Sequence, residues 1–176
     1  YPFGLLDEAV YTESDTRFHF SDEQQLKGVS SKGITTQFPL EGARSLYGAT
    51  KLASELLITE YIEFLGLKAV INRCGVLTGP WQMGKVDQGV IVLWMARHFW
   101  KRNLTYNGYG GMGKQVRDML HIHDLFRLVD WQMQHMDEVN GQISNVGGGL
   151  GCSVSLKELT AICESITGNS IMITPV

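Results

Sequence analysis

The sequence predicts an α/β fold organised around a parallel sheet. Residues 45–65 show helical spacing of apolar side chains, and Gly66 and a short apolar strand at 68–72 follow them directly. A strand at 142–146, a glycine-rich turn and a helix opening at Ser155 repeat the alternation later in the chain. Alternating helices and strands are typical of parallel sheets. The composition, 44% hydrophobic and 19% charged over 176 residues, is that of an ordinary globular protein.

The helix predicted over 45–65 carries its own start and stop signals. Ser45 is placed to cap the amino end, and Gly66 suits the left-handed turn that ends many helices. Residues 1–43 show little periodicity and are expected to be irregular, which makes them long for a loop in a compact domain.

The remaining elements follow in order. Residues 89–101 are expected to form a helix that is buried around most of its circumference, and a Ser155–Glu158 capping box opens the last helix, which ends near Gly168. The other expected elements are a glycine-rich loop at 74–88, strands at 104–106, 115–120 and 142–146, a helix at 124–136, and the beginning of a strand at 171–176.

Bulk properties narrow the class of protein. The net charge of −3 comes without a basic run, which argues against a nucleic-acid surface, and no apolar run approaches the ~20 residues of a membrane span. Cys74, Cys152 and Cys163 fit neither a disulfide framework nor a zinc site, so no metal is expected and a reducing cytoplasm is the natural location. Because the chain starts Tyr1-Pro2 without an initiator Met, it is expected to be part of a longer protein.

Tyr47 and Lys51 form the pattern that carries chemistry. Residues four apart lie on one helical face, one turn apart, so both side chains can reach one ligand. A phenol is protonated at neutral pH, and a neighbouring ammonium favours its ionised form. Such a pair can take a proton from a sugar hydroxyl while hydride leaves the same carbon. The pattern alone is weak, because a surface pair at this spacing is the ordinary case.

The residues around Tyr47 and Lys51 strengthen the case that this pair is catalytic. The run Ser45-Leu46-Tyr47-Gly48-Ala49-Thr50-Lys51-Leu52-Ala53-Ser54-Glu55 resembles the catalytic helix of the NAD-dependent epimerase/dehydratase family, which belongs to the extended short-chain dehydrogenases/reductases. Further segments resemble that family in order from about residue 44 to the end of the chain. They are 72–80, 104–108, 115–124 and 145–149.

The resemblance implies the C-terminal half of a Rossmann-type parallel sheet with a small substrate-binding subdomain. Residues 1–74 would complete the NAD-binding domain, and residues 75–176 would mainly bind a nucleotide-diphosphate sugar. It also implies a homodimer built on the exposed faces of helices 45–65 and 89–101. The site residues carried over are Tyr47 and Lys51 for catalysis and NAD, Cys74 for NAD, and Val86, Gln88, Tyr106 and Arg117 for the nucleotide sugar.

Within the family the likeness is greatest to the CDP-paratose (CDP-tyvelose) 2-epimerases, through Leu77-Thr78-Gly79-Pro80 and the stretch 84–89. Val76 stands where most relatives carry an Asn that binds the sugar nucleotide, so that contact is unassigned. A nucleotide-sugar 4-epimerase, a 4,6-dehydratase and a non-catalytic nucleotide-sugar-binding or dimerisation module remain alternatives.

One glycine pattern is expected to be a decoy. Residues 108–113 match the G-x-G-x-x-G spacing of a dinucleotide-binding loop, but the residues after Gly113 read as a strand rather than a helix. A turn between two short strands is expected there, and the dinucleotide-binding loop is expected upstream of Tyr1.

Overall fold

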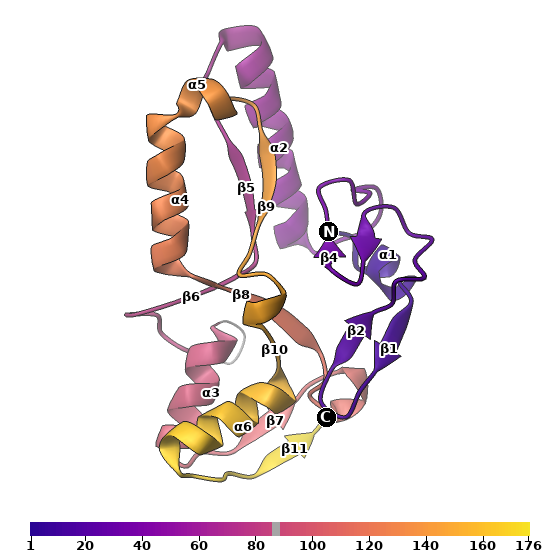
Figure 1. Ribbon diagram of the computed structural model, residues 1–176, viewed down its shortest axis with the longest axis vertical. Helices are drawn as coiled ribbons and strands as arrows, with labels where there is room; N and C mark the ends of the chain where they lie inside the picture. Colours follow the sequence, from indigo (N-terminus) through magenta and orange to yellow (C-terminus); the bar gives the residue numbers. More distant parts are fainter. Residues whose placement is uncertain (86–88) are drawn as a thin grey trace. The chain divides into compact units, whose positions relative to one another are not determined.

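The computed structural model describes residues 1–85 and 89–176, and it confirms an α/β fold with parallel strands (Figure 1). The chain forms two compact units. The first comprises Tyr1–Tyr11, Phe20–Cys74 and Asp124–Val146, and the second comprises Thr12–His19, Gly75–His123 and Gly147–Val176. No helix among the described residues is both long and apolar enough to cross a membrane.

Helix α2 (Leu46–Leu65) of the first unit has the ends that the sequence predicts. The Ser45 hydroxyl accepts a hydrogen bond from the Gly48 amide at 3.0 Å, and Gly66 adopts the left-handed conformation at φ 66°. These contacts satisfy groups that a helix end otherwise leaves unpaired. None of the helix residues is fully buried, so α2 is held largely by its own caps and by contacts along one side.

The first unit is organised on a pair of parallel strands, β5 (Ile71–Cys74) and β9 (Ile143–Val146). Two consecutive residues of β5 contact different helices. Arg73 binds the Glu55 carboxylate of α2 at 2.7 Å, and Asn72 exchanges amide hydrogen bonds with Gln132 of α4 (Ile122–Gln134). Because successive strand residues point to opposite faces, α2 and α4 cover opposite faces of the pair. The sequence predicted strand β5 at 68–72, a few residues before its observed position at Ile71–Cys74.

The first 43 residues contain more regular structure than the sequence predicts. Phe38 is 2% exposed and meets the Tyr1 ring edge-on at 5.1 Å, which gives this region a small core. Its elements are α1 (Phe3–Asp7), the hairpin of β1 (Tyr11–Glu13) and β2 (Phe18–Phe20), and the antiparallel pair of β3 (Val29–Ser30) and β4 (Gly33–Ile34). Residues 12–19 of that hairpin belong to the second unit. A short α5 (Met136–Val139) follows α4 in the first unit.

The second unit has its own hydrophobic core. Trp94 of α3 (Val90–Phe99), Leu104 of β7 (Leu104–Tyr106), and Leu159 and Cys163 of α6 (Leu156–Thr167) form it. Strand β11 (Ile173–Pro175) pairs in parallel with β7. Most residues of α3 are buried or partly buried, as expected, but Met95 and Phe99 are exposed. Only Trp94 and His98 are fully buried, because one side of the helix packs on this core.

A three-stranded sheet completes the second unit. β8 (Val116–His121) lies between β6 (Val76–Thr78), to which it is parallel, and β10 (Ser153–Ser155), to which it is antiparallel. The short 3₁₀ turns Tyr109–Gly111 and Leu150–Cys152 precede β8 and β10. The glycine pattern at 108–113 is therefore a turn between two strands, as predicted.

An ion pair ties residues 12–19 to the amino end of α6. Arg17 donates to both Glu158 oxygens, at 2.8 and 3.0 Å from its Nε, and its other nitrogens reach Ser153. Glu158 also completes the capping box with Ser155. The Arg17 guanidinium is the main cause that lowers the Glu158 pKa from 4.5 to about 2.

We expect this pair to make stability depend on acid pH. A carboxylate whose pKa is lowered by folding stabilises the fold above its ordinary pKa, and that contribution disappears as pH falls from 4.5 toward 2. Urea unfolding between pH 6 and pH 2.5 should show the loss. Arg17→Gln should cost about 1–3 kcal/mol at pH 6 and flatten the pH dependence. Arg127→Gln on α4 is the control, and equal slopes for both variants would contradict the assignment.

Candidate functional site

Tyr47 and Lys51 lie in the first two turns of α2, on the same face. The Lys51 Nζ is 5.3 Å from the centre of the Tyr47 ring, and both side chains are exposed, Tyr47 to 72%. The Thr50 hydroxyl donates to the Tyr47 carbonyl oxygen at 2.8 Å, within the same turn. A phenol and an ammonium are thus presented together to whatever covers this face.

This pair fits the ribose and nicotinamide end of NAD chemically. Both heads project from one helical turn, and a ribose offers hydroxyls that accept from an ammonium and exchange hydrogen bonds with a phenol.

Cys74 ends strand β5 and is exposed. Its sulfur contacts the Asn72 carbonyl oxygen at 3.7 Å, and desolvation raises the pKa of the thiol. Desolvation thus favours the protonated, neutral form of this thiol.

Arg117 projects from strand β8 into solvent. Its guanidinium donates to the carbonyl oxygen of the preceding Val116 at 2.9 Å, which leaves other donors of the planar group facing outward. An exposed guanidinium can bind phosphate oxygens through two parallel hydrogen bonds. The side chain is therefore available for the role that the family resemblance implies.

Asp118 fastens strand β8 to the glycine-rich loop before β10. Its carboxylate accepts from the Gly148 amide at 2.9 Å. A Cβ at Gly147 would lie 1.8 Å from the same carboxylate, and a Cβ at Gly148 would lie 2.0 Å from the Met119 carbonyl oxygen. Glycines are required because the loop backbone lies directly against the strand.

Tyr106 is oriented toward the core of the second unit. Its hydroxyl is 2.7 Å from the Thr160 hydroxyl, and its ring stacks near Trp94 with 6.0 Å between centres. Burial raises the pKa of its phenol. Val86 and Gln88 lie outside the described residues.

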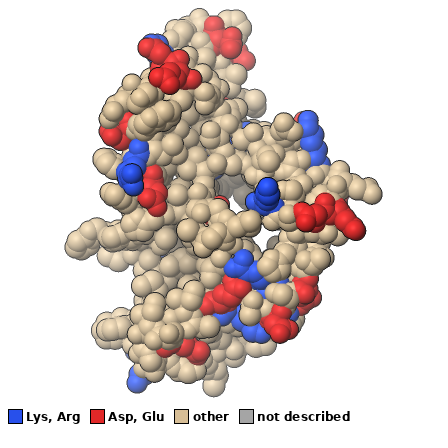
Figure 2. Space-filling view, in the orientation of Figure 1, with Lys and Arg blue, Asp and Glu red and all other residues tan. Residues whose placement is uncertain are grey.

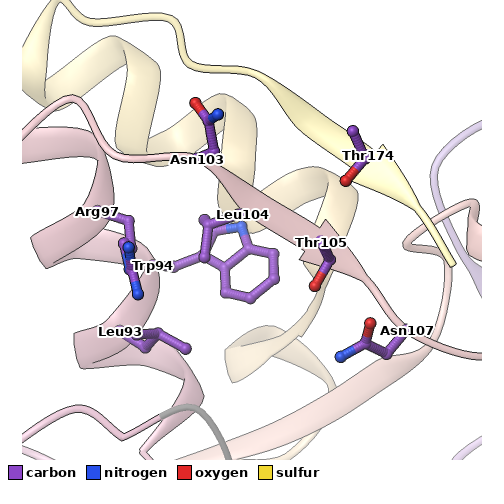
Figure 3. Close-up of a pocket in the computed structure, with 8 residues that line it drawn as sticks. All are labelled: Leu93, Trp94, Arg97, Asn103, Leu104, Thr105, Asn107 and Thr174. Atoms are coloured by element: carbon purple, nitrogen blue, oxygen red, sulfur yellow. The ribbon is translucent and has the colours of Figure 1, made fainter.

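The second unit holds a cavity along β7, called here the β7 cavity, that the sequence did not predict. It has a volume of about 200 Å³ and is lined by Trp94 of α3, by Thr105 of β7 and by Asn107 directly after β7 (Figure 3). Its other lining residues are Leu93, Arg97, Asn103, Leu104 and Thr174. The sequence offered one signal for these lining residues. In a strand, successive side chains point to opposite faces, so Thr105 and Asn107 lie on the face opposite to Tyr106.

Charge is interspersed over the surface. On the face drawn in Figure 2, basic and acidic side chains lie among each other, and neither forms a continuous field. This distribution suits a small anionic ligand held by individual arginines better than a long polyanion.

Comparison with known proteins supplies the family. A model of the NAD dependent epimerase/dehydratase family matches residues 8–147. The chain therefore belongs to this family, whose name gives NAD as the cofactor. Its fold also fits that of solved epimerases and dehydratases.

Individual relatives differ in activity. The chain is 29% identical to CDP-paratose 2-epimerase from Salmonella typhi, over 92% of this chain and 46% of the relative. It is 29% identical to UDP-glucose 4-epimerase from Corynebacterium glutamicum, over 78% of this chain and 44% of the relative. It matches dTDP-glucose 4,6-dehydratase from Streptomyces venezuelae, solved with NAD bound, at 26% identity and a TM-score of 0.61, over 79% of this chain and 41% of the other. The chain thus spans less than half the length of these relatives.

Proposed function

We propose that the chain is part of an NAD-dependent enzyme that epimerises a nucleotide-linked sugar, in the manner of a CDP-paratose 2-epimerase. The observation that carries the proposal is the Tyr47–Lys51 pair, one turn apart on an exposed face of α2 with the ammonium 5.3 Å from the ring. Because the chain spans 46% of the CDP-paratose 2-epimerase, we assign the activity to a longer polypeptide.

In this proposal Tyr47 handles a proton. Its phenol oxygen accepts the proton of a sugar hydroxyl and later returns it. NAD, when bound, would supply a nicotinamide able to accept a hydride from the same carbon and to return it. The Lys51 ammonium, 5.3 Å from the Tyr47 ring, holds a ribose hydroxyl. The keto sugar formed in between presents its opposite face before the hydride and proton return, so the configuration at that carbon inverts without net oxidation.

The second unit would hold the nucleotide end. Arg117 offers a fork of donors for the diphosphate. The β7 cavity is smaller than the ~300 Å³ or more of a typical ligand pocket, so it fits one ring rather than a whole nucleotide. We propose that a base enters it, with Thr105 and Asn107 as hydrogen-bonding partners.

We further propose that the enzyme is a homodimer. Large apolar side chains are exposed along α2, including Leu56 at 62%, Leu57 at 60% and Phe64 at 79%. An apolar helix face of this kind favours burial against another helix.

The proposal is tested by assaying the complete protein with CDP-, UDP- and dTDP-linked sugars and following the products by NMR. We expect a C2 epimer from a CDP-sugar, with NAD neither consumed nor reduced overall. A C4 epimer or a 4-keto-6-deoxy product would instead place the enzyme with the 4-epimerases or the 4,6-dehydratases. Failure to convert any of these sugars would reject the enzymatic proposal.

The 176-residue chain by itself should bind NAD only weakly. Its sequence contains no glycine-rich loop between a strand and a helix that fits the dinucleotide signature, since the 108–113 pattern is a turn leading into β8. We expect a dissociation constant of about 1 mM or higher by isothermal titration calorimetry. A micromolar complex of this chain with NAD would contradict the expectation.

A further inference from the structure

Helix α3 ends in a conformation that brings two arginines together. Lys101 lies in the left-handed region at φ 51°, its amide donates to the His98 carbonyl oxygen at 3.2 Å, and the Arg102 amide donates to that of Arg97 at 2.8 Å. These are the two hydrogen bonds of a Schellman motif. Glycine usually takes the left-handed position, so holding lysine there has a conformational cost.

The motif usually packs two apolar side chains against each other, from the positions that Arg97 and Arg102 occupy here. Both arginines line a groove of about 430 Å³. No acidic residue lies among its described lining residues, and neither guanidinium forms an ion pair with a described residue. Two cations placed together without a counter-charge repel each other, and a bound anion would relieve that repulsion.

The groove has a defined floor and wall. Leu93, Ala96, Arg97 and Trp100 recur at the spacing of one face of α3. Gly84 closes one side, and a Cβ there would lie 2.7 Å from the Leu93 amide nitrogen, so that segment lies directly against the helix. The Trp100 side chain remains 69% exposed and offers an aromatic face beside the arginines.

We propose that this groove binds a phosphate-bearing small molecule that carries a planar ring. The guanidinium groups of Arg97 and Arg102 bind the phosphate oxygens, for which their planar donor geometry is suited. The Trp100 indole stacks on the ring. The lining combines charge with an aromatic surface, which a bare inorganic anion would use only in part.

The groove adjoins the β7 cavity proposed for the base and shares Leu93 and Arg97 with it, which Figure 3 shows projecting from α3. Arg102 and Trp100 line the groove and are absent from the lining of the cavity. Binding at the groove can therefore be tested without turnover, and a failure here would leave the epimerase proposal intact.

A simpler role for the arginines would be to interact with the negative carbonyl end of α3. In that case Arg102→Gln would lower the stability of the fold slightly and leave ligand affinity unchanged. Binding measurements separate the two roles.

The experiment titrates the 176-residue chain with phenyl phosphate and with inorganic phosphate, using calorimetry at low ionic strength. We expect phenyl phosphate to bind more tightly than inorganic phosphate. Arg102→Gln should weaken the binding of both by about tenfold or more, because a charge-assisted contact is lost. Arg127→Gln removes the same charge from α4 and should change neither. Trp100→Ala should weaken phenyl phosphate and spare inorganic phosphate.

Circular dichroism of each variant establishes that it is folded. Arg102→Lys provides a second test, because it keeps the positive charge and removes the planar set of donors of the guanidinium. Its affinity should fall between those of the wild type and Arg102→Gln. The proposal is overturned if phenyl phosphate does not bind, if Arg102→Gln binds as the wild type does, or if Trp100→Ala has no effect. It is also overturned if Asn107→Ala in the neighbouring cavity, rather than Arg102→Gln, abolishes binding.

Discussion

Replacing Tyr47 with phenylalanine should lower the turnover of the complete protein by about 10²–10⁴-fold, the usual effect of removing a general acid–base group. The phenol oxygen is the atom proposed to carry the sugar proton, and phenylalanine keeps the ring beside Lys51 while deleting that oxygen. The effect should fall on kcat, with KM for the nucleotide sugar changed little.

The matched control is Tyr61→Phe, which makes the same change farther along α2. Tyr61 is 50% exposed and lies nearly three turns from Lys51, so we expect it to leave turnover within about twofold. Unchanged turnover in Tyr47→Phe would refute the mechanism and favour a non-catalytic sugar-binding module.

Replacing Gly148 with alanine should cost the second unit about 2–4 kcal/mol of unfolding free energy. The added Cβ would lie 2.0 Å from the Met119 carbonyl oxygen and 2.5 Å from the Cys152 Cβ, neither of which belongs to a flexible chain end. The loop must move, and that movement also breaks the Asp118–Gly148 hydrogen bond. Urea unfolding followed by tryptophan fluorescence measures the loss.

Gly151→Ala is the control within the same loop, because nothing lies within 4 Å of its added Cβ. It should stay within about 0.5 kcal/mol of the wild type. A similarly small change for Gly148→Ala would show that the loop is not held against β8 as described.

The sequence predicted best those features that are set by neighbouring residues. The caps at Ser45, Gly66 and Gly168 and the Ser155–Glu158 box all lie within one helical turn of what they cap. Such local contacts leave a readable spacing. The Tyr47–Lys51 pair could be found for the same reason.

Contacts between residues far apart in the chain could not be predicted, because no local spacing of residues indicates them. Arg17 and Glu158 are separated by 141 positions, and nothing near either residue indicates the other. The regular structure of residues 1–43 depends on packing such as that of Tyr1 against Phe38, which periodicity does not reveal. The groove lined by Arg97 and Arg102 depends on Lys101 adopting the left-handed conformation. A lysine does not indicate that conformation in a sequence, because glycine is the residue that usually adopts it.

Among the apolar helices, periodicity predicted helix α3 but not which of its apolar residues are exposed. The apolar character of a residue does not show whether its side chain packs on a core or is exposed. The exposed Met95, Phe99 and Trp100 therefore could not be distinguished from core residues. The exposed apolar residues of α2 are ambiguous in the same way.

Helix α2 has a consequence for backbone dynamics. With none of its 20 residues fully buried, its amide hydrogen bonds are protected mainly by the helix itself and its two caps. Regions with little burial open locally at low free-energy cost, so amide hydrogen exchange along α2 should be fast in this chain compared with α6, where Leu159 and Cys163 are buried. Covering the exposed side of the helix should slow that exchange. The exchange rate of α2 amides is therefore a direct measure of whether that side of the helix is occupied.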